Sequence, residues 1–269
     1  MQPERRGWRR PSERFALVCA FLLWAQAVAG QSFDHAHKAW DALLKRHVVL
    51  AHDAKASRLR YAGMASDRAA LKRYLDSLSA VRETEFDAWP EAERMAFLIN
   101  AYNAFTIEKI LTRYPDIRSI WDFGKLFGNP FKDPFFVLLE RKRTLDWIEH
   151  EQLRGRYREA RIHYAVNCAS VGCPMLREEA FVASRLEAQL EEQARRFLSD
   201  RTRNRLRAGR LEISRIYDWF KEDFEPRAKY FARYAEFLAD DPRERHAVVE
   251  GRAQLRFLDY DWSLNDASP

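Results

Sequence analysis

The segment RIHYAVNCASVGCP, residues 161–174, holds the densest group of reactive side chains in the sequence. It carries His163 and two cysteines, Cys168 and Cys173, which are separated by four residues. A thiolate can attack a carbonyl carbon, exchange with a disulfide or bind a metal ion, and two oxidised cysteines form a structural crosslink. The chemistry of this segment therefore depends on whether its two sulfur atoms are bonded to each other.

Four interpretations of the pair are open. In an exported protein an even pair favours a disulfide, although closing so short a loop would stabilise the fold by only about 2 kcal/mol. A strained short-loop disulfide would be easily reduced, which allows a redox role. A nucleophilic Cys168 would need a histidine as base, a lowered thiol pKa and an exposed sulfur. Zinc would lack a fourth ligand beyond Cys168, Cys173 and His163, and the spacing matches no standard finger, so no metal or other cofactor is predicted.

The reach of His163 depends on the backbone between it and the cysteines. If residues 161–168 are extended, His163 and Asn167 share one face and Cys168 lies on the other. A turn at residues 169–172 would then be needed before the imidazole could approach either sulfur. His163 is therefore a candidate base for Cys168, but the spacing alone does not bring the two together.

A second group of polar residues lies on an apolar segment. Asn100, Asn103 and Thr106 are three residues apart, so they form one polar stripe on a helix that is otherwise apolar nearly all round. A buried amide without a partner costs about 1–3 kcal/mol, so these amides must be paired. We expect them to bind the backbone of a neighbouring loop, such as residues 123–134. The alternative is that they line a polar cleft beside His163.

The elements that must position these residues follow from hydrophobic spacing and from capping residues. Helices are expected at 33–48, at 67–81 behind Ser66 or Asp67, at 90–114 from Pro90, from a Thr144 cap to about 153, at 177–198, and after Ser214 and Pro226. Strands are expected at 135–140, 162–168 and 255–260, with a basic turn at 141–143 and a hairpin at 204–213 turning at Ala208-Gly209. The pattern predicts an α+β fold: a mostly helical single domain packed on a small, largely antiparallel sheet.

The N-terminus has the pattern of a secretory signal peptide. Five arginines precede an uncharged run at residues 15–24, and Ala27-Val28-Ala29 resembles a cleavage site. Residues 1–29 are therefore predicted to be removed, leaving residues 30–269 as one periplasmic or extracellular domain. Their removal takes away Cys19 and lowers the formal net charge from +6 to +3. A mature domain with so little excess charge is not expected to bind nucleic acid, and no remaining segment is long and apolar enough for stable membrane insertion.

Five ordered motifs resemble domain-of-unknown-function family 547: FLINAYNAFTI, TLDWIEHEQLR, RIHYAVNCASVGCPMLR, LEISRIYDWFKEDF and LDYDWSLND. The resemblance spans roughly residues 33–266, and it implies exported bacterial or plant relatives without assigning an activity. The positions that fall on the motifs are Asn100, Tyr102, Asn103, Glu149, His150, His163, Asn167, Cys168, Ser170, Cys173, Pro174, Ser214 and Asp223. Phe131 stands where a tryptophan is common in this family.

These observations predict an exported binding or interaction domain in which a Cys168–Cys173 disulfide braces a loop over a polar cleft. The residues expected to line the cleft are Asn100, Tyr102, Asn103, Glu149, His150, His163, Asn167 and Ser170. The alternatives are a thiol-dependent hydrolase or acyltransferase, with Cys168 attacking and His163 or His150 as base, and a thiol–disulfide redox protein. The sequence names no partner for any of the three.

Overall fold

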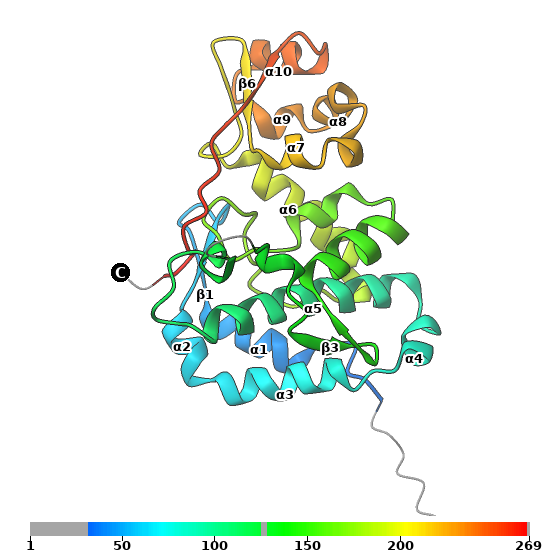
Figure 1. The fold of residues 1–269 in the computed structure, drawn as a ribbon. Coiled ribbons are helices and arrows are strands. Elements are labelled where there is room, and N and C mark those ends of the chain that lie inside the picture. The colour runs from blue at the N-terminus through cyan, green and yellow to red at the C-terminus, as the bar shows by residue number, and fades with distance from the viewer. Residues whose placement is uncertain (1–31, 125–127, 268–269) are drawn as a thin grey trace, which may run out of the picture. The chain divides into compact units, whose positions relative to one another are not determined.

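A computed structural model describes residues 32–124 and 128–267 of the chain (Figure 1). The predicted signal peptide, residues 1–29, lies outside the described residues. The α-helices are α1 (Lys38–His47), α2 (Tyr61–Ser66), α3 (Arg68–Ser79), α4 (Glu83–Asp87), α5 (Glu91–Leu111), α6 (Leu186–Ser199), α7 (Ile216–Trp219), α8 (Arg227–Arg233), α9 (Ala235–Leu238) and α10 (Pro242–Val249). The strands are β1 (Val48–Leu50), β2 (Ser57–Leu59), β3 (Phe136–Leu138), β4 (Arg141–Arg143), β5 (Arg205–Arg207), β6 (Arg210–Ile213) and β7 (Gln254–Phe257).

The described residues also contain six helical segments that are not α-helices. Five are 3-10 helices: η1 (Ile120–Gly124), η2 (Pro130–Lys132), η4 (Ala160–Tyr164), η5 (Ala183–Arg185) and η6 (Lys221–Phe224). The remaining one, η3 (Trp147–Arg154), is a π-helix. The described residues therefore form a mostly helical α+β domain, as predicted. In place of one sheet they contain three small ones, in which three of the four strand pairs are antiparallel.

Helix α5 is the centre of the larger hydrophobic core (Figure 1). Nearly every residue from Met95 to Leu111 is buried, as expected of a helix that is apolar on all sides. Pro90 is the N-cap residue, and the helix begins at Glu91 rather than at Pro90 itself. A proline is tolerated at this end of a helix because it has no N–H that would need a partner. Helices α1 and α3 pack beside it, and their buried faces carry the leucines and aromatic residues that the spacing indicated.

A second core forms around α6–α10 and the sheet β5-β6-β7. The hairpin β5–β6 turns at Ala208 and Gly209, as predicted, and both residues have positive φ. Strand β7 then pairs in parallel with β6 on the side opposite β5. Aromatic residues from α7, η6 and α8 fill the space beneath the sheet.

The segment that follows β7, residues 258–267, connects the two cores (Figure 1, red). Its backbone hydrogen-bonds with β6 at one end, then with Ala169, and finally with Leu59 of β2. The segment also packs tightly on Gly172, where an added Cβ would lie 3.0 Å from the backbone of Asp261. Side chains from this segment therefore face the cysteine loop.

The predicted strand at 162–168 is wrong. Residues 160–164 form the 3-10 helix η4, and the chain continues as a loop. Two groups that a strand would pair with its neighbour, the Ala165 carbonyl and the Asn167 N–H, bond instead to the side chain of Asn103. A short run buried on every side has no periodicity that separates a strand from a helical turn.

Other boundaries also differ from the prediction. The first helix begins only at Lys38, and residues 177–182 precede α6 as a loop because the Gln189 side chain bonds the backbone of Ala180 and Val182. Asp67 makes no side-chain cap on α3. The basic residues 141–143 form strand β4, and the turn lies at Leu139 and Glu140.

Two predicted caps have their expected bonds. The Thr144 hydroxyl accepts a hydrogen bond from the backbone N–H of Trp147, at 2.9 Å, ahead of η3. The Ser214 hydroxyl likewise accepts one from Ile216, ahead of α7. Within the described ranges no helix is long and apolar enough to cross a membrane.

The amide of Asn103 provides a test of how the loops are held on α5. Asn103→Leu would leave the Ala165 carbonyl and the Asn167 N–H buried without partners, so the free energy of unfolding should fall by about 3 kcal/mol. Urea denaturation followed by circular dichroism measures this loss. Glu91→Gln, in the exposed first turn of the same helix, should change little. A loss below about 1 kcal/mol for Asn103→Leu would show that the loops do not depend on the amide.

Candidate functional site

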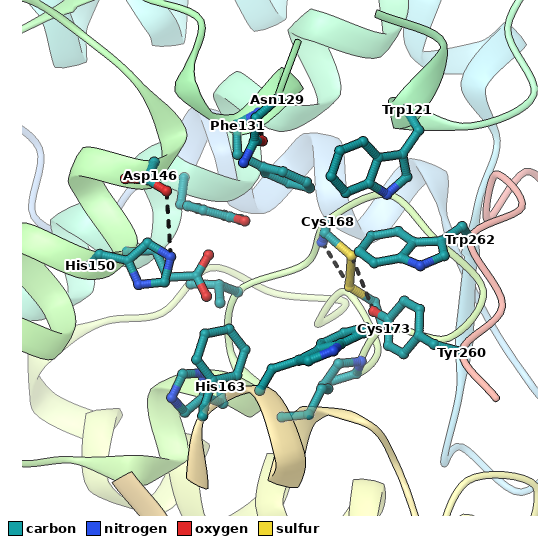
Figure 2. A pocket seen from close by; sticks show the side chains of 17 residues that line it. Trp121, Asn129, Phe131, Asp146, His150, His163, Cys168, Cys173, Tyr260 and Trp262 are labelled. Atoms are coloured by element: carbon teal, nitrogen blue, oxygen red, sulfur yellow. Dashed lines mark hydrogen bonds and ion pairs between the residues drawn. A yellow bond between two sulfur atoms is a disulfide. The ribbon is translucent and has the colours of Figure 1, made fainter. Parts of the chain in front are cut away.

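A pocket of about 460 Å³ lies where the two cores meet (Figure 2). Its walls come from α5, η1, η2, η3, the cysteine loop, α7 and the C-terminal segment. Seven of its lining side chains are aromatic: Tyr102, Trp121, Phe131, Trp219, Phe220, Tyr260 and Trp262. The pocket therefore combines an aromatic wall with the cysteine pair and with a smaller polar side.

The two cysteines form a disulfide on the pocket wall, as predicted, with their Cα atoms 6.2 Å apart. The loop around them is held by short hydrogen bonds. The Asn167 side chain donates to the Pro174 carbonyl and accepts from the Ala169 N–H, and the Cys168 N–H donates to the Cys173 sulfur. Ala169 has a positive φ of 61°, which supplies the turn that the sequence required.

The Cys168 sulfur also contacts two hydroxyl groups. Its neighbours are the Ser170 hydroxyl at 3.0 Å and the Tyr260 hydroxyl at 3.3 Å. Burial raises the pKa of Tyr260 above its ordinary value, so this phenol stays protonated at neutral pH. The disulfide is thus surrounded by uncharged donors.

The polar side of the pocket comes from the π-helix η3 and the residue before it. Glu149 and His150 line the pocket from this helix, and Asp146 lines it from the position before the helix. Figure 2 shows Asp146 and His150 opposite Trp121 and Trp262. The Glu149 carboxylate lies beside the Tyr102 hydroxyl. Burial first, and then that carboxylate, raise the pKa of Tyr102 well above its ordinary value. Single π-helical turns recur at functional sites, where they turn side chains toward a ligand.

Behind this side an ion network joins two histidines. The Asp223 carboxylate accepts hydrogen bonds from the Arg154 guanidinium at 2.5 Å and from His163 Nε2 at 2.6 Å. Arg154 Nη1 donates to His150 Nδ1 at 2.8 Å. Arginine is always a donor, so His150 Nδ1 holds a lone pair and its proton lies on Nε2, 3.6 Å from Asp146.

The predicted catalytic residues, Cys168 and His163, line the same pocket. Among the described residues, no hydrogen bond joins the two side chains. His163 donates to Asp223, stacks on Phe220 at 4.2 Å and has a side chain only 1% exposed. Cys168 is bonded to Cys173. In the described part of the chain, no hydrogen bond joins a sulfur to His163 or His150. Thiol catalysis through these residues stays a prediction that needs a reduced Cys168 and a rearranged base.

The other predicted cleft residues divide into two groups. Tyr102, Glu149 and His150 line the pocket, whereas Asn100, Asn103, Asn167 and Ser170 are not among its lining residues. Asn100 exchanges two hydrogen bonds with the backbone of Phe181, and Asn103 binds Ala165 and Asn167. The amides therefore tie loops to α5, as expected, although the loops are not residues 123–134. The cleft is also more aromatic than predicted.

Sequence reasoning missed most of the aromatic wall and Asp146. Trp121, Trp219 and Trp262 come from segments that are distant in sequence, and single tryptophans in loops have no periodic pattern. Trp219 lies in the motif LEISRIYDWFKEDF, and Tyr260 and Trp262 lie in the motif LDYDWSLND. Their place in these two motifs of the family resemblance could have marked them as candidate pocket residues. In the ranges that the structure describes, no three His, Cys, Asp or Glu side chains gather closely enough to hold a metal ion.

The pH dependence of stability tests the ion network. Burial works to raise the pKa of Asp223, but the hydrogen bonds from His163 and Arg154 outweigh it and hold the pKa at about 2, below the ordinary 3.8. A lowered pKa in the folded state stabilises the protein fully above about pH 4, and this contribution is lost as the pH falls toward 2. Asp223→Asn should therefore cost about 1 kcal/mol at pH 7, after allowance for solvent screening.

Urea denaturation of the wild type and of Asp223→Asn at pH 7, 4 and 2.5 measures this difference. The gap between the two proteins should narrow as the pH falls. Asp218→Asn, which changes a carboxylate paired with Arg215 at the surface, serves as the control and should show a smaller gap throughout. A gap that stays constant from pH 7 to 2.5 would contradict the assignment of the lowered pKa to Asp223.

Comparison with known proteins finds similarity to one family over part of the chain. No curated protein and no solved structure is significantly similar to the chain. Residues 86–198 match the profile of a family described as "Protein of unknown function, DUF547". The matched region is shorter than the resemblance suggested; it contains Tyr102, η3 and the cysteine loop, and it ends before α7. Residues 86–198, less than half of the chain, are therefore similar to the DUF547 family.

Proposed function

We propose that this protein is an exported ligand-binding domain whose pocket is braced by the Cys168–Cys173 disulfide. The observation that carries the proposal is the pocket itself, about 460 Å³ in volume, which falls within the range of small-molecule sites. Its lining converges from parts of the chain as distant as Tyr102 and Trp262. A mostly apolar concave wall with a few placed polar groups is the usual form of such a site.

Two exposed tryptophans at the pocket support this proposal. Trp121 and Trp219 are 39% and 43% exposed, although both belong to the pocket lining. Large aromatic side chains gain free energy when a partner covers them, so an exposed aromatic patch commonly marks a binding surface. A ligand in the pocket would cover both rings.

The disulfide would act as a brace because it joins the two ends of the loop that forms one wall. Cys168, Cys173 and Pro174 line the pocket from this loop. Val171 and Gly172, between the cysteines, are fixed to the C-terminal segment by backbone hydrogen bonds. Loss of the crosslink would let the loop move and would change the shape of the wall.

Binding to the pocket can be tested with aromatic fragments by ligand-observed NMR. Trp219→Ala should abolish the binding of most fragments that bind the wild type, because it removes an exposed ring from the wall without opening the core. Leu255→Ala, which removes an exposed apolar side chain outside the pocket, should leave binding unchanged. If fragments bind the Trp219→Ala variant as well as the wild type, the pocket is not the ligand site.

The brace is tested by Cys168→Ala/Cys173→Ala. The double variant should lose about 2 kcal/mol of unfolding free energy, as expected for a loop this short, and should bind the same fragments more weakly. The oxidised wild type should show no thiol that can be alkylated when it is analysed by mass spectrometry. Two alkylated cysteines in the native protein would contradict the proposal.

A redox function is the second candidate, because both cysteines of the disulfide line the pocket. The reduction potential separates the two functions. A structural brace should have a potential below about −300 mV, whereas a thiol–disulfide exchanger requires a more oxidising value. Equilibration with glutathione buffers, followed by alkylation and mass spectrometry, measures it. A potential near that of the glutathione pool would favour the redox function.

A further inference from the structure

We infer that the pocket binds an organic cation, a ligand with an ammonium group on an apolar or ring-shaped body. This inference rests on the proposed binding function and names the chemical class of its ligand. It follows from the charges that face the pocket and from the arrangement of the aromatic rings opposite them.

The charges facing the pocket are negative. Asp146 and Glu149 are the carboxylates in the lining, and the described lining contains no lysine or arginine. Arg154, which bonds to the lining residue His150, is itself outside the lining and is paired with Asp223. A positively charged ligand would therefore be attracted, and an anionic one repelled.

The two histidines of the lining are engaged with other side chains. His150 Nδ1 accepts a hydrogen bond from Arg154, so this nitrogen carries a lone pair. His163 is buried and donates a hydrogen bond from Nε2 to the Asp223 carboxylate, which does not belong to the pocket lining. Tyr102, beside Glu149, remains a neutral donor at physiological pH. In the described lining, the carboxylates of Asp146 and Glu149 therefore face no lysine or arginine.

The aromatic rings opposite the carboxylates stand at varied angles, as in sites that enclose a cation. Trp121 meets Trp262 at 84° with ring centroids 5.3 Å apart, and Trp219 stacks on Trp262 at 27° and 5.6 Å. Figure 2 shows Trp121, Tyr260 and Trp262 together on one side of the pocket. The faces of such rings carry partial negative charge and attract ammonium groups by about 0.5–2 kcal/mol each. Rings and carboxylates thus favour the same sign of ligand charge.

A metal ion fits this lining less well than an organic cation. Hard cations take six or more oxygen ligands, or several waters with two carboxylates close together, and indole rings contribute none. In the residues that the structure describes, no three candidate metal ligands come together. The volume of about 460 Å³ also exceeds what one ion needs, and it suits a ligand with an apolar body.

The closing experiment compares cations with a neutral molecule of the same shape. Choline and benzyltrimethylammonium are titrated against the disulfide-bonded protein by isothermal calorimetry and NMR, beside 3,3-dimethylbutan-1-ol, in which carbon replaces the nitrogen of choline. At least one of the two cations should bind at least tenfold more tightly than the alcohol. If the alcohol and the cations bind equally, or if only the alcohol binds, the ligand class is wrong and the pocket proposal stands. If no cation, alcohol or aromatic fragment binds in a manner that depends on Trp219, both proposals fail.

Variants that remove single charges test whether Glu149 and Asp146 cause the preference for cations. Glu149→Gln and Asp146→Asn keep the shapes of the side chains and should each weaken cation binding at least fivefold while leaving the alcohol unaffected. Glu151→Gln makes the same change of charge on the same π-helix, but at an exposed position outside the pocket, and should have no effect. Cation binding that weakens equally in Glu151→Gln would mean that only the overall charge matters, which would overturn the inference.

Discussion

The buried amides of Asn100 and Asn103 hold the pocket together. Each gives and accepts one hydrogen bond with backbone that has no regular partner, at Phe181 in one case and at Ala165 and Asn167 in the other. An irregular loop can be buried only if its backbone groups are satisfied in this way. Because α5 is a rigid, wholly buried helix, the loops bonded to it acquire fixed positions, and the cysteine pair is fixed with them.

As a result, the residues of α5 that line the pocket and those that hold the loops lie on different faces of this helix. Asn103 binds the backbone of Ala165 and Asn167, just before the cysteine loop. Tyr102, one residue earlier, lines the pocket beside Glu149. Adjacent residues on a helix point in directions about 100° apart, so one short motif can serve both purposes. The motif FLINAYNAFTI therefore combines structural amides with a pocket residue.

Much of the fold could be predicted from local patterns. The all-round apolar character of residues 95–111 indicated a buried helix, and the Ala208-Gly209 turn indicated the hairpin. Segment 162–168 was misassigned because apolar residues on every side suit either a strand or a helical turn. The π-helix η3 was expected only as a helix, since its sequence spacing does not differ from that of an α-helix over two turns.

The site was less predictable, because its contacts join residues far apart in the chain. His163 and Asp223 are sixty residues apart, and no spacing rule pairs them. The disulfide was predictable because its partners are close in sequence. The pairing of acidic and aromatic side chains in the described lining was not, since it depends on residues that converge from distant segments.

The path of the C-terminal segment sets an order for maturation. Tyr260 and Trp262 follow every other lining residue along the chain, whereas Cys168 and Cys173 are neighbours that an oxidant can join as soon as both emerge. The crosslink can therefore form before the rest of the chain has been synthesised. The pocket closes only after the segment beyond β7 has docked against Ala169 and Leu59. The pocket is therefore complete only after synthesis has proceeded past Trp262.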